Sequence, residues 1–246
     1  MNGFLRIGES SVLEVLNKTH LLKHSKITKF NMEHPNAFAS GMEFEYDPES
    51  FLYFRCRAIS AEVPNKNGDY FDWDELKKAY TSFIGKGFYL NHDSDSPTKS
   101  KGIILDARLV DEGKYIETLV AVSRQIAPEI CQLIEAGIIG HVSMGCYASR
   151  AKCSICSNEA TNMETLCEHM NPQSAHYVKG RALNDGNRAF EYNYDISFNE
   201  LSGVAIPADG EAHIFEVLAK LGKAGTIEEI KIRIAEINKL LAAIEE

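Results

Sequence analysis

GIIGHVSMGCYASR, residues 137–150, places one hydroxyl where an apolar run meets a glycine. The apolar lead-in runs directly into Ser143, and Met144 and Gly145 follow it. The next residues are typical of a strand, so we expect Ser143 on stiff backbone whose neighbouring amides can point at a substrate oxygen. This arrangement suits a nucleophile in acyl transfer. A buried serine packed beside a small residue in a strand gives the same local pattern.

Composition and charge limit the classes of protein to consider. The chain has 246 residues, of which 44% are hydrophobic and 25% are charged, so it suits one large globular domain or a domain with appendages. A net charge of −9 argues against general nucleic-acid binding, because phosphate contacts need Lys and Arg. No apolar run approaches the ~20 residues of a membrane span, and the first residues lack a signal-peptide pattern. We therefore expect a protein made in a reducing cytoplasm, with neither nucleic acid nor membrane as a partner and without disulfides.

Three divisions of the chain are expected. Residues 1–48 combine a short helical pattern at 13–24 with a polar, irregular stretch and predict an N-terminal arm, whereas residues 49–222 carry the main domain. Residues 223–246 predict an amphipathic helix that begins with a capping box at Thr226 and Glu229. Its apolar residues repeat every three or four positions, as in a coiled coil, so the helix either lies on the domain or associates with another copy. The stripe consists of Ile227, Ile230, Ile234, Ile237, Leu241 and Ile244.

The main domain shows both strand and helix patterns, and we expect an α+β fold. Residues 102–123 read as a hairpin with its turn at 111–113, and Pro128 starts a helix that ends at Gly137. The remaining expected elements are strands over residues 51–63, 88–90, 146–148 and 195–207, and helices over residues 72–87 and 211–222.

His92 is the natural partner for Ser143. It ends a short apolar strand, and an imidazole that titrates near neutral pH can accept the hydroxyl proton and return it to a leaving amine. A third, acidic group is needed to orient the ring, and Glu200 is the candidate because it is a charged residue entering a strand whose remaining positions are mostly apolar. Three aspartates remain competitors for this third position: Asp93, Asp95 and Asp106.

A cysteine-rich insertion, residues 151–176, predicts a metal site. Its spacing is C-x2-C-x10-C-x-H, and a CxxC turn followed by a second Cys/His pair is how short loops enclose tetrahedral zinc. A closed set of four ligands leaves no position for a water, so the zinc is expected to be structural. The expected ligands are Cys153, Cys156, Cys167 and His169, with Cys146 and His176 as spares.

Five ordered blocks resemble the prohead (head-maturation) proteases of tailed bacteriophages, a serine-peptidase family distantly similar to herpesvirus assemblin. The blocks are VPNKNGDYF at 63–71, FYLNHD at 88–93, GIILDARLVDEGKYI at 102–116, VSMG at 142–145 and NELSGVAIPADGEA at 199–212. The zinc-like insertion is not a general feature of that family.

The resemblance implies a compact, mostly antiparallel β-barrel wrapped by helices. It implies Ser143 as nucleophile, His92 as base and Glu200 as the acidic third member. Herpesvirus-type enzymes place arginines close after their third residue, and none follows Glu200 closely here. We therefore expect an oxyanion site of backbone amides near residues 144–146, with Arg150 as a further contributor. The implied role is a serine endopeptidase inside the assembling procapsid in the host cytoplasm. It would cut scaffold or core protein, segments of the major capsid protein and itself.

Two other functions remain as alternatives. The first is a non-catalytic capsid-assembly or scaffold component that keeps the protease fold, because the heptad stripe and acidic charge also suit such a role. The second is a zinc-dependent hydrolase, which a closed Cys3His set disfavours because it offers no water-bearing position.

Overall fold

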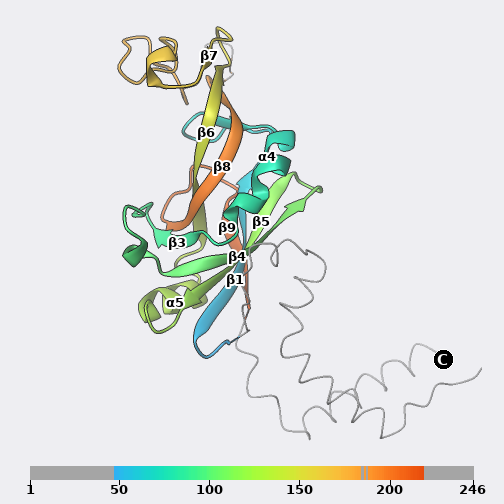
Figure 1. The fold of residues 1–246 in the computed structure, drawn as a ribbon, viewed down its shortest axis with the longest axis vertical. Coiled ribbons are helices and arrows are strands. Elements are labelled where there is room, and N and C mark those ends of the chain that lie inside the picture. Colours follow the sequence, from blue (N-terminus) through green and yellow to red (C-terminus); the bar gives the residue numbers. More distant parts are fainter. Residues whose placement is uncertain (1–46, 184–185, 187, 219–246) are drawn as a thin grey trace, which may run out of the picture.

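A nine-stranded sheet forms the body of residues 47–183, 186 and 188–218, which are the residues that the computed structural model describes (Figure 1). An additional pairing of β8 with β6 joins the run of strands between them into a ring. In sheet order the strands are β2 (Asp69–Phe71), β8 (Glu191–Val204), β3 (Gly87–Leu90), β4 (Gly102–Val110), β5 (Tyr115–Ser123), β1 (Phe51–Ser60), β9 (His213–Leu218), β6 (His141–Cys153) and β7 (Glu159–Ala160).

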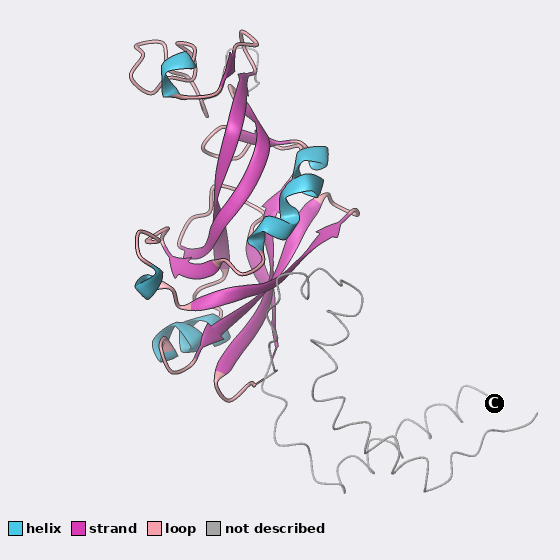
Figure 2. Ribbon diagram, in the orientation of Figure 1, coloured by secondary structure: helices cyan, strands magenta, loops and turns pink. Residues whose placement is uncertain are grey.

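The expected mostly β architecture is confirmed, and helices are few (Figure 2). The pairings are antiparallel except those of β2 and β3 with β8, which are parallel. The paired strands form a ring rather than a barrel wrapped by helices. The helical segments of the described chain are α4 (Trp73–Ala79), α5 (Pro128–Glu135) and the short 3-10 turns η1 (Tyr80–Phe83), η2 (Pro97–Lys99) and η3 (Met163–Thr165).

Local sequence signals explain several elements. Asp72 caps α4 because its carboxylate accepts the backbone N–H of Asp74 at 2.9 Å, and the helix continues as η1 instead of running to residue 87. Pro128 opens α5, and Gly137 follows that helix with φ of 72°, which suits glycine. The β4–β5 hairpin turns at residues 111–114, as its pattern predicts.

Aromatic contacts between the strands and η1 hold the core together. Phe83 of η1 stacks on Phe198 of β8 with ring centroids 3.9 Å apart, and Phe54 meets Phe88 edge-on at 5.4 Å. All four rings are fully buried. Aromatic pairs of this kind add to the free energy that burial of their apolar surface contributes, so they fix η1 against β8 and β1 against β3.

The helix expected over residues 211–222 is wrong for the part that the structure describes. His213–Leu218 is strand β9, which pairs with β1 and meets β6 at His141. The apolar residues of this segment have helical spacing, but Ile214, Phe215 and Val217 also favour a strand. Pairing with the free edge of β1 selects the strand conformation over the helix. Strand β8 also begins earlier than expected, at Glu191.

Two expected segments lie outside the described residues. They are residues 1–46 of the N-terminal arm and the amphipathic helix over residues 223–246, together with its coiled-coil association. Across the part of the chain that the structure describes, no helix is both long enough and apolar enough to cross a bilayer.

Candidate active site

Ser143 lies on β6, directly across the β6–β8 ladder from Ser202. Its exposed fraction is 9%, so the residue is held in the sheet rather than on a mobile loop. Two positions further along β6, Gly145 faces Glu200, and side chains two apart on a strand point to the same face of the sheet. Ser143 on β6 and the Glu200–Ser202 pair on β8 therefore occupy one small area of the ring.

An irregularity in the ladder brings Glu200 close to β6. Gly145 pairs with Glu200 and the next residue, Cys146, pairs with Phe198, so Asn199 is an extra residue in β8, as in a β-bulge. A Cβ atom at Gly145 would lie 2.6 Å from the Glu200 Oε1 atom and 2.9 Å from the Asn199 Oδ1 atom. Glycine is thus the residue that this approach of the carboxylate requires.

His92 sits in a tight turn at the end of β3. Asn91 and His92 have φ of 50° and 60°, and the Asp93 N–H donates to the Leu90 carbonyl at 3.0 Å, as in a type I′ turn. The Asn91 N–H donates to the Gly203 carbonyl of β8 at 3.0 Å, which ties the turn to the neighbouring strand. A histidine with positive φ is strained, and such strain is concentrated at functional sites.

A hydrogen-bonded chain connects His92 to β8. The His92 Nδ1 atom lies 2.8 Å from the Glu200 Oε1 atom, and the exposed fraction of Glu200 is 2%. The Ser202 hydroxyl donates to the other oxygen of Glu200, Oε2, at 2.6 Å and accepts the His92 backbone N–H at 3.1 Å. The hydrogen bond to Glu200 raises the pKa of His92 above its ordinary value, against an opposing effect of burial.

The structure therefore brings His92 and Glu200 into contact and places the three competing aspartates elsewhere. Asp93 and Asp95 both pair with Lys99, at 2.5 Å and 2.9 Å. Asp106 is fully buried on β4, where its Oδ1 atom accepts the Ala107 N–H. Burial raises the pKa of Asp106 to about 7, and the nearby carboxylate of Glu117 adds to that increase.

Arg150 does not lie beside Ser143, contrary to the expectation for the oxyanion site. It is seven residues further along β6, opposite Tyr194, and its guanidinium stacks over that ring at 4.4 Å from the centroid. Seven strand residues span roughly 20 Å at ~3.3 Å per residue. Arg150 also forms a salt bridge with Glu159 of β7 at 3.3 Å, so it joins β6 to β7 and β8 instead.

Two neighbouring surface cavities of about 450 and 470 Å³ both include His92 and Ser143 in their walls. The first extends along β6 past Met144, Gly145 and Cys146, and several polar side chains also line it. The second lies against residues 204–208, which are mostly apolar. The two side chains thus stand where the cavities meet, as expected of groups that act on the middle of an extended ligand.

Sequence reasoning missed Ser202, and it missed the structural roles of Gly145 and Asn91. The signal for Ser202 is present, because residue 202 follows Glu200 by two positions in a strand and must share its face. Asn91 is the residue type that most readily accepts positive φ after glycine, and it precedes the histidine directly. For Gly145 the sequence gives only a glycine in a strand, which is typical of a bulge or a close approach.

The four expected metal ligands gather at one place. The ligand atoms of Cys153, Cys156, Cys167 and His169 all lie within 4.8 Å of one another, so this group could hold a metal ion such as zinc. The Ile155 N–H donates to the Cys153 Sγ atom at 3.3 Å, which turns the CxxC loop around its first sulfur. Burial alone would raise the pKa of Cys156, but hydrogen bonds from the Asn158 backbone, His169 and the other two cysteines lower it to about 7. The spares, Cys146 and His176, are not members of this group.

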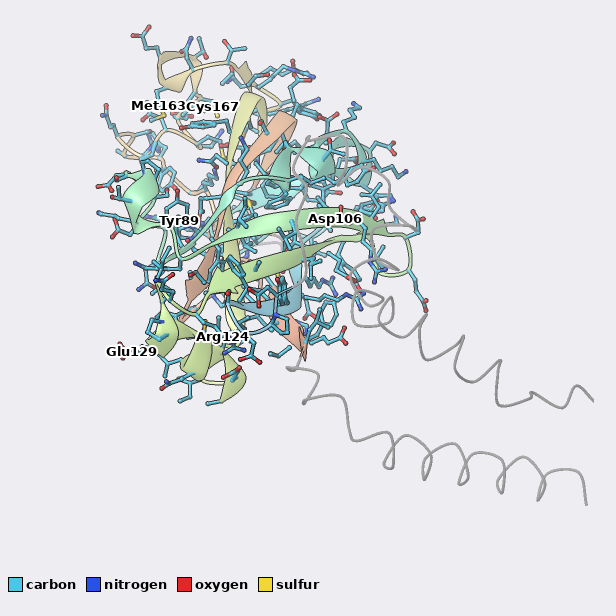
Figure 3. All side chains as sticks on the ribbon, turned by 60° about the horizontal axis from the view of Figure 1, so that its bottom comes forward. Tyr89, Asp106, Arg124, Glu129, Met163 and Cys167 are labelled. Carbon is cyan, nitrogen blue, oxygen red and sulfur yellow. The ribbon has the colours of Figure 1, made fainter. Side chains whose placement is uncertain are left out.

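This Cys3His group stands far from Ser143. Cys153 ends β6 ten residues after Ser143, which is roughly 30 Å of strand at ~3.3 Å per residue. Cys167 and Met163 lie near β7, at the end of the molecule opposite Glu129 of α5 (Figure 3). The group is thus placed to support the segment that follows β6, not to contact a ligand bound at Ser143.

Similarity to known proteins is limited to solved structures. No protein-family model matches the chain, and no curated protein sequence matches it. Among solved structures, the capsid assembly protease of bacteriophage T4 aligns with a TM-score of 0.39 and 16% sequence identity, over 62% of this chain and 80% of that one. At this TM-score the likeness establishes neither a shared fold nor a shared activity.

Proposed function

We propose that the chain is a serine endopeptidase of the phage prohead-protease type, with Ser143 as nucleophile, His92 as general base and Glu200 as the group that orients the imidazole. The contact between His92 and the buried Glu200 carboxylate, beside a serine on the adjoining strand, carries this proposal. A histidine bonded through Nδ1 to a carboxylate is the arrangement by which serine hydrolases fix the tautomer and stabilise the imidazolium.

The proposed reaction begins with attack of the Ser143 Oγ atom on a peptide carbonyl carbon. The His92 Nε2 atom accepts the hydroxyl proton, and the resulting imidazolium transfers it to the leaving amine as the C–N bond breaks. The product is an ester on Ser143. A water that gives one proton to His92 then attacks the ester, and the imidazolium returns that proton to the Ser143 oxygen as the C–O bond breaks and the acid product leaves.

The tetrahedral intermediates need donors for their oxyanion. Residues 144–146 follow the nucleophile and line the cavity beside it, so their backbone amides are the donors we assign to this role. Arg150 has no part in it. The peptide would lie across both cavities, with the bond to be cut where they meet at His92 and Ser143.

The sequence resemblance supplies the substrate class. Scaffold or core protein and segments of the major capsid protein are the proposed substrates, inside an assembling procapsid, and the chain itself is a further one. Incubation of the chain with the scaffold and capsid proteins of the phage concerned tests this class. Defined fragments are expected, and a serine-dependent activity on unrelated peptides that spares both head proteins would contradict it.

We also propose that the Cys3His group binds one zinc ion and that this ion is structural. The segment around it has a very small core, in which Cys153, Met170 and Ala189 are the buried apolar residues. So little apolar surface cannot stabilise a segment of this length, and small modules of this kind use a metal instead. Three thiolates and one imidazole are one of the ligand sets that hold tetrahedral zinc in structural sites.

The pH dependence of hydrolysis tests the role of His92. Glu200 raises the pKa of His92 above 6.5, the ordinary pKa of a histidine. The active, neutral imidazole should therefore form only as the pH rises above 6.5. The plot of kcat/KM against pH should therefore rise with an inflection above 6.5. In Glu200→Gln the inflection should move down toward 6.5 and the plateau should fall by roughly 10²–10⁴-fold. An identical inflection in both proteins would contradict the assignment.

The effect of the same contact on folding has the opposite sign. A histidine whose pKa is raised in the folded state contributes stability that is fully present below its unfolded pKa and is lost as pH rises through the folded value. The free energy of unfolding, measured as a function of pH, should lose this small contribution above pH 6.5, in the range where the activity increases. Glu200→Gln removes the contact and should remove this part of the pH dependence.

Gly145→Ala should lower kcat by roughly 10²-fold, because the new methyl group would push the Glu200 carboxylate away from His92. Gly140→Ala is the matched control, since a Cβ there would lie 3.6 Å from the Gly137 carbonyl oxygen, an ordinary contact. Steady-state kinetics of the two variants provide the comparison. Equal activities would mean that the approach of Glu200 to β6 has no importance for catalysis.

A further inference from the structure

Ser202 engages both partners of the His92–Glu200 contact with a single hydroxyl group. Its Oγ atom donates to the Glu200 Oε2 atom at 2.6 Å and accepts the backbone N–H of His92 at 3.1 Å. The residue is fully buried, so water does not compete for either bond. Ser202 also pairs with Tyr89 of β3 on one side and with Ser143 of β6 on the other, which places it between the two strands that carry the site.

Of these two hydrogen bonds, one orients the Glu200 carboxylate and the other holds the backbone of His92. The Glu200 carboxylate has two oxygens, and the bond from Ser202 to Oε2 fixes the rotation that leaves Oε1 facing the His92 Nδ1 atom. The backbone of His92 has φ of 60°, an unfavourable conformation for a non-glycine residue that must be held by its surroundings. Accepting the N–H of that residue is a direct way to hold it.

We propose that Ser202 is a positioning residue of this site, which aligns Glu200 and the turn that carries His92 without touching the substrate. This inference rests on the proposed function, because it assigns Ser202 to the same site. It goes further in saying that the His92–Glu200 contact depends on a third side chain, that of Ser202, which lies on β8 like Glu200. Ser202 does not act as a second nucleophile, since its hydroxyl is fully buried and its hydrogen is engaged by Glu200.

Other charged groups near His92 do not duplicate this role. Lys66 lines the second cavity, where its Nζ atom donates to the Pro207 carbonyl at 3.0 Å. Asp69 and Glu191, which also line the first cavity, both pair with Lys179. In the adjoining loop Asp93 and Asp95 pair with Lys99. Asp209, also of the first cavity, accepts the backbone N–H groups of Ser60 and Glu211.

The test compares three substitutions at one position with a control on the same strand. Ser202→Ala removes the hydroxyl, Ser202→Cys keeps the size with a much weaker donor, and Ser202→Thr keeps the hydroxyl. Ser197→Ala, at an exposed position of β8, is the matched control. We expect kcat to fall at least about tenfold in the Ala and Cys variants with little change in KM, to recover largely in the Thr variant, and to stay unchanged in the control.

A second readout separates positioning from a merely structural role and needs no substrate. The pKa of His92, followed by NMR of its ring, should fall toward 6.5 in Ser202→Ala, because Glu200 is no longer held against Nδ1. A pKa of His92 that is unchanged or raised, in a variant whose thermal unfolding is normal, would overturn the proposal. Since this measurement does not use catalysis, it also distinguishes failure of the positioning role from failure of Ser143 as a nucleophile.

Discussion

Ser143→Ala should reduce the rate of peptide hydrolysis by at least about 10³-fold, with the fold and its thermal stability nearly unchanged. The loss is large because the variant cannot form the ester on which both halves of the reaction depend. KM should change little, since the hydroxyl does not contribute the main contacts to the peptide. Steady-state kinetics on a peptide or protein substrate, with circular dichroism as a check of folding, provide the measurement.

Ser149→Ala is the matched control for this substitution. Ser149 lies on the same strand and is exposed, and its hydroxyl donates to the Asp195 carboxylate at 3.1 Å. This variant should retain full activity. Undiminished hydrolysis in Ser143→Ala would end the assignment of the nucleophile, and an absence of processing by the unmodified chain would favour a non-catalytic assembly protein.

Loss of the zinc ligands should have the second large effect, but on structure instead of chemistry. Cys167→Ser should abolish stoichiometric zinc binding, because it removes one of the four ligands. Since such an ion contributes on the order of 10 kcal/mol to the folding of small modules, the segment after β6 should then lose protection from hydrogen exchange. The ring of strands should keep its protection, and the rate of hydrolysis should change by less than about threefold. Metal analysis and hydrogen exchange by mass spectrometry measure both parts.

His176→Ala controls for the loss of a potential ligand in the same segment. Its ring is exposed and does not belong to the group of four, so zinc content should stay at one ion per chain. Full zinc content in Cys167→Ser would contradict the ligand assignment. Activity that returns in proportion to added metal, with the fold already intact, would contradict a structural role for the ion.

Much of the secondary structure could be predicted because it is determined by residues that are close together in the sequence. The hairpin of β4 and β5, the start of α5 at Pro128 and the cap of α4 at Asp72 all depend on residues within a few positions of one another. The Cys3His group is local in the same sense, since its spacing alone brings the ligands together. Segment 213–218 differs, because its strand conformation depends on pairing with β1, far away in the sequence.

In the candidate site too, residue types could be predicted from the sequence, whereas the contacts between distant residues could not. His92 and Glu200 could each be singled out by type and position, but their contact joins residues 108 positions apart and follows from the parallel pairing of β3 with β8. The need for glycine at position 145 arises only once the bulge at Asn199 brings the carboxylate against β6. Such close approaches are set by tertiary packing and leave almost no mark on the local sequence.

Labelling with a fluorophosphonate tests the central claim most directly. The reagent forms a bond between its phosphorus and a serine oxygen as fluoride leaves, and it reacts rapidly only where a base activates the hydroxyl. We predict a single adduct that peptide mapping by mass spectrometry places on Ser143 and that is lost or greatly slowed in His92→Ala. An adduct on another residue, or active hydrolysis by a chain whose Ser143 stays unlabelled, would contradict this account.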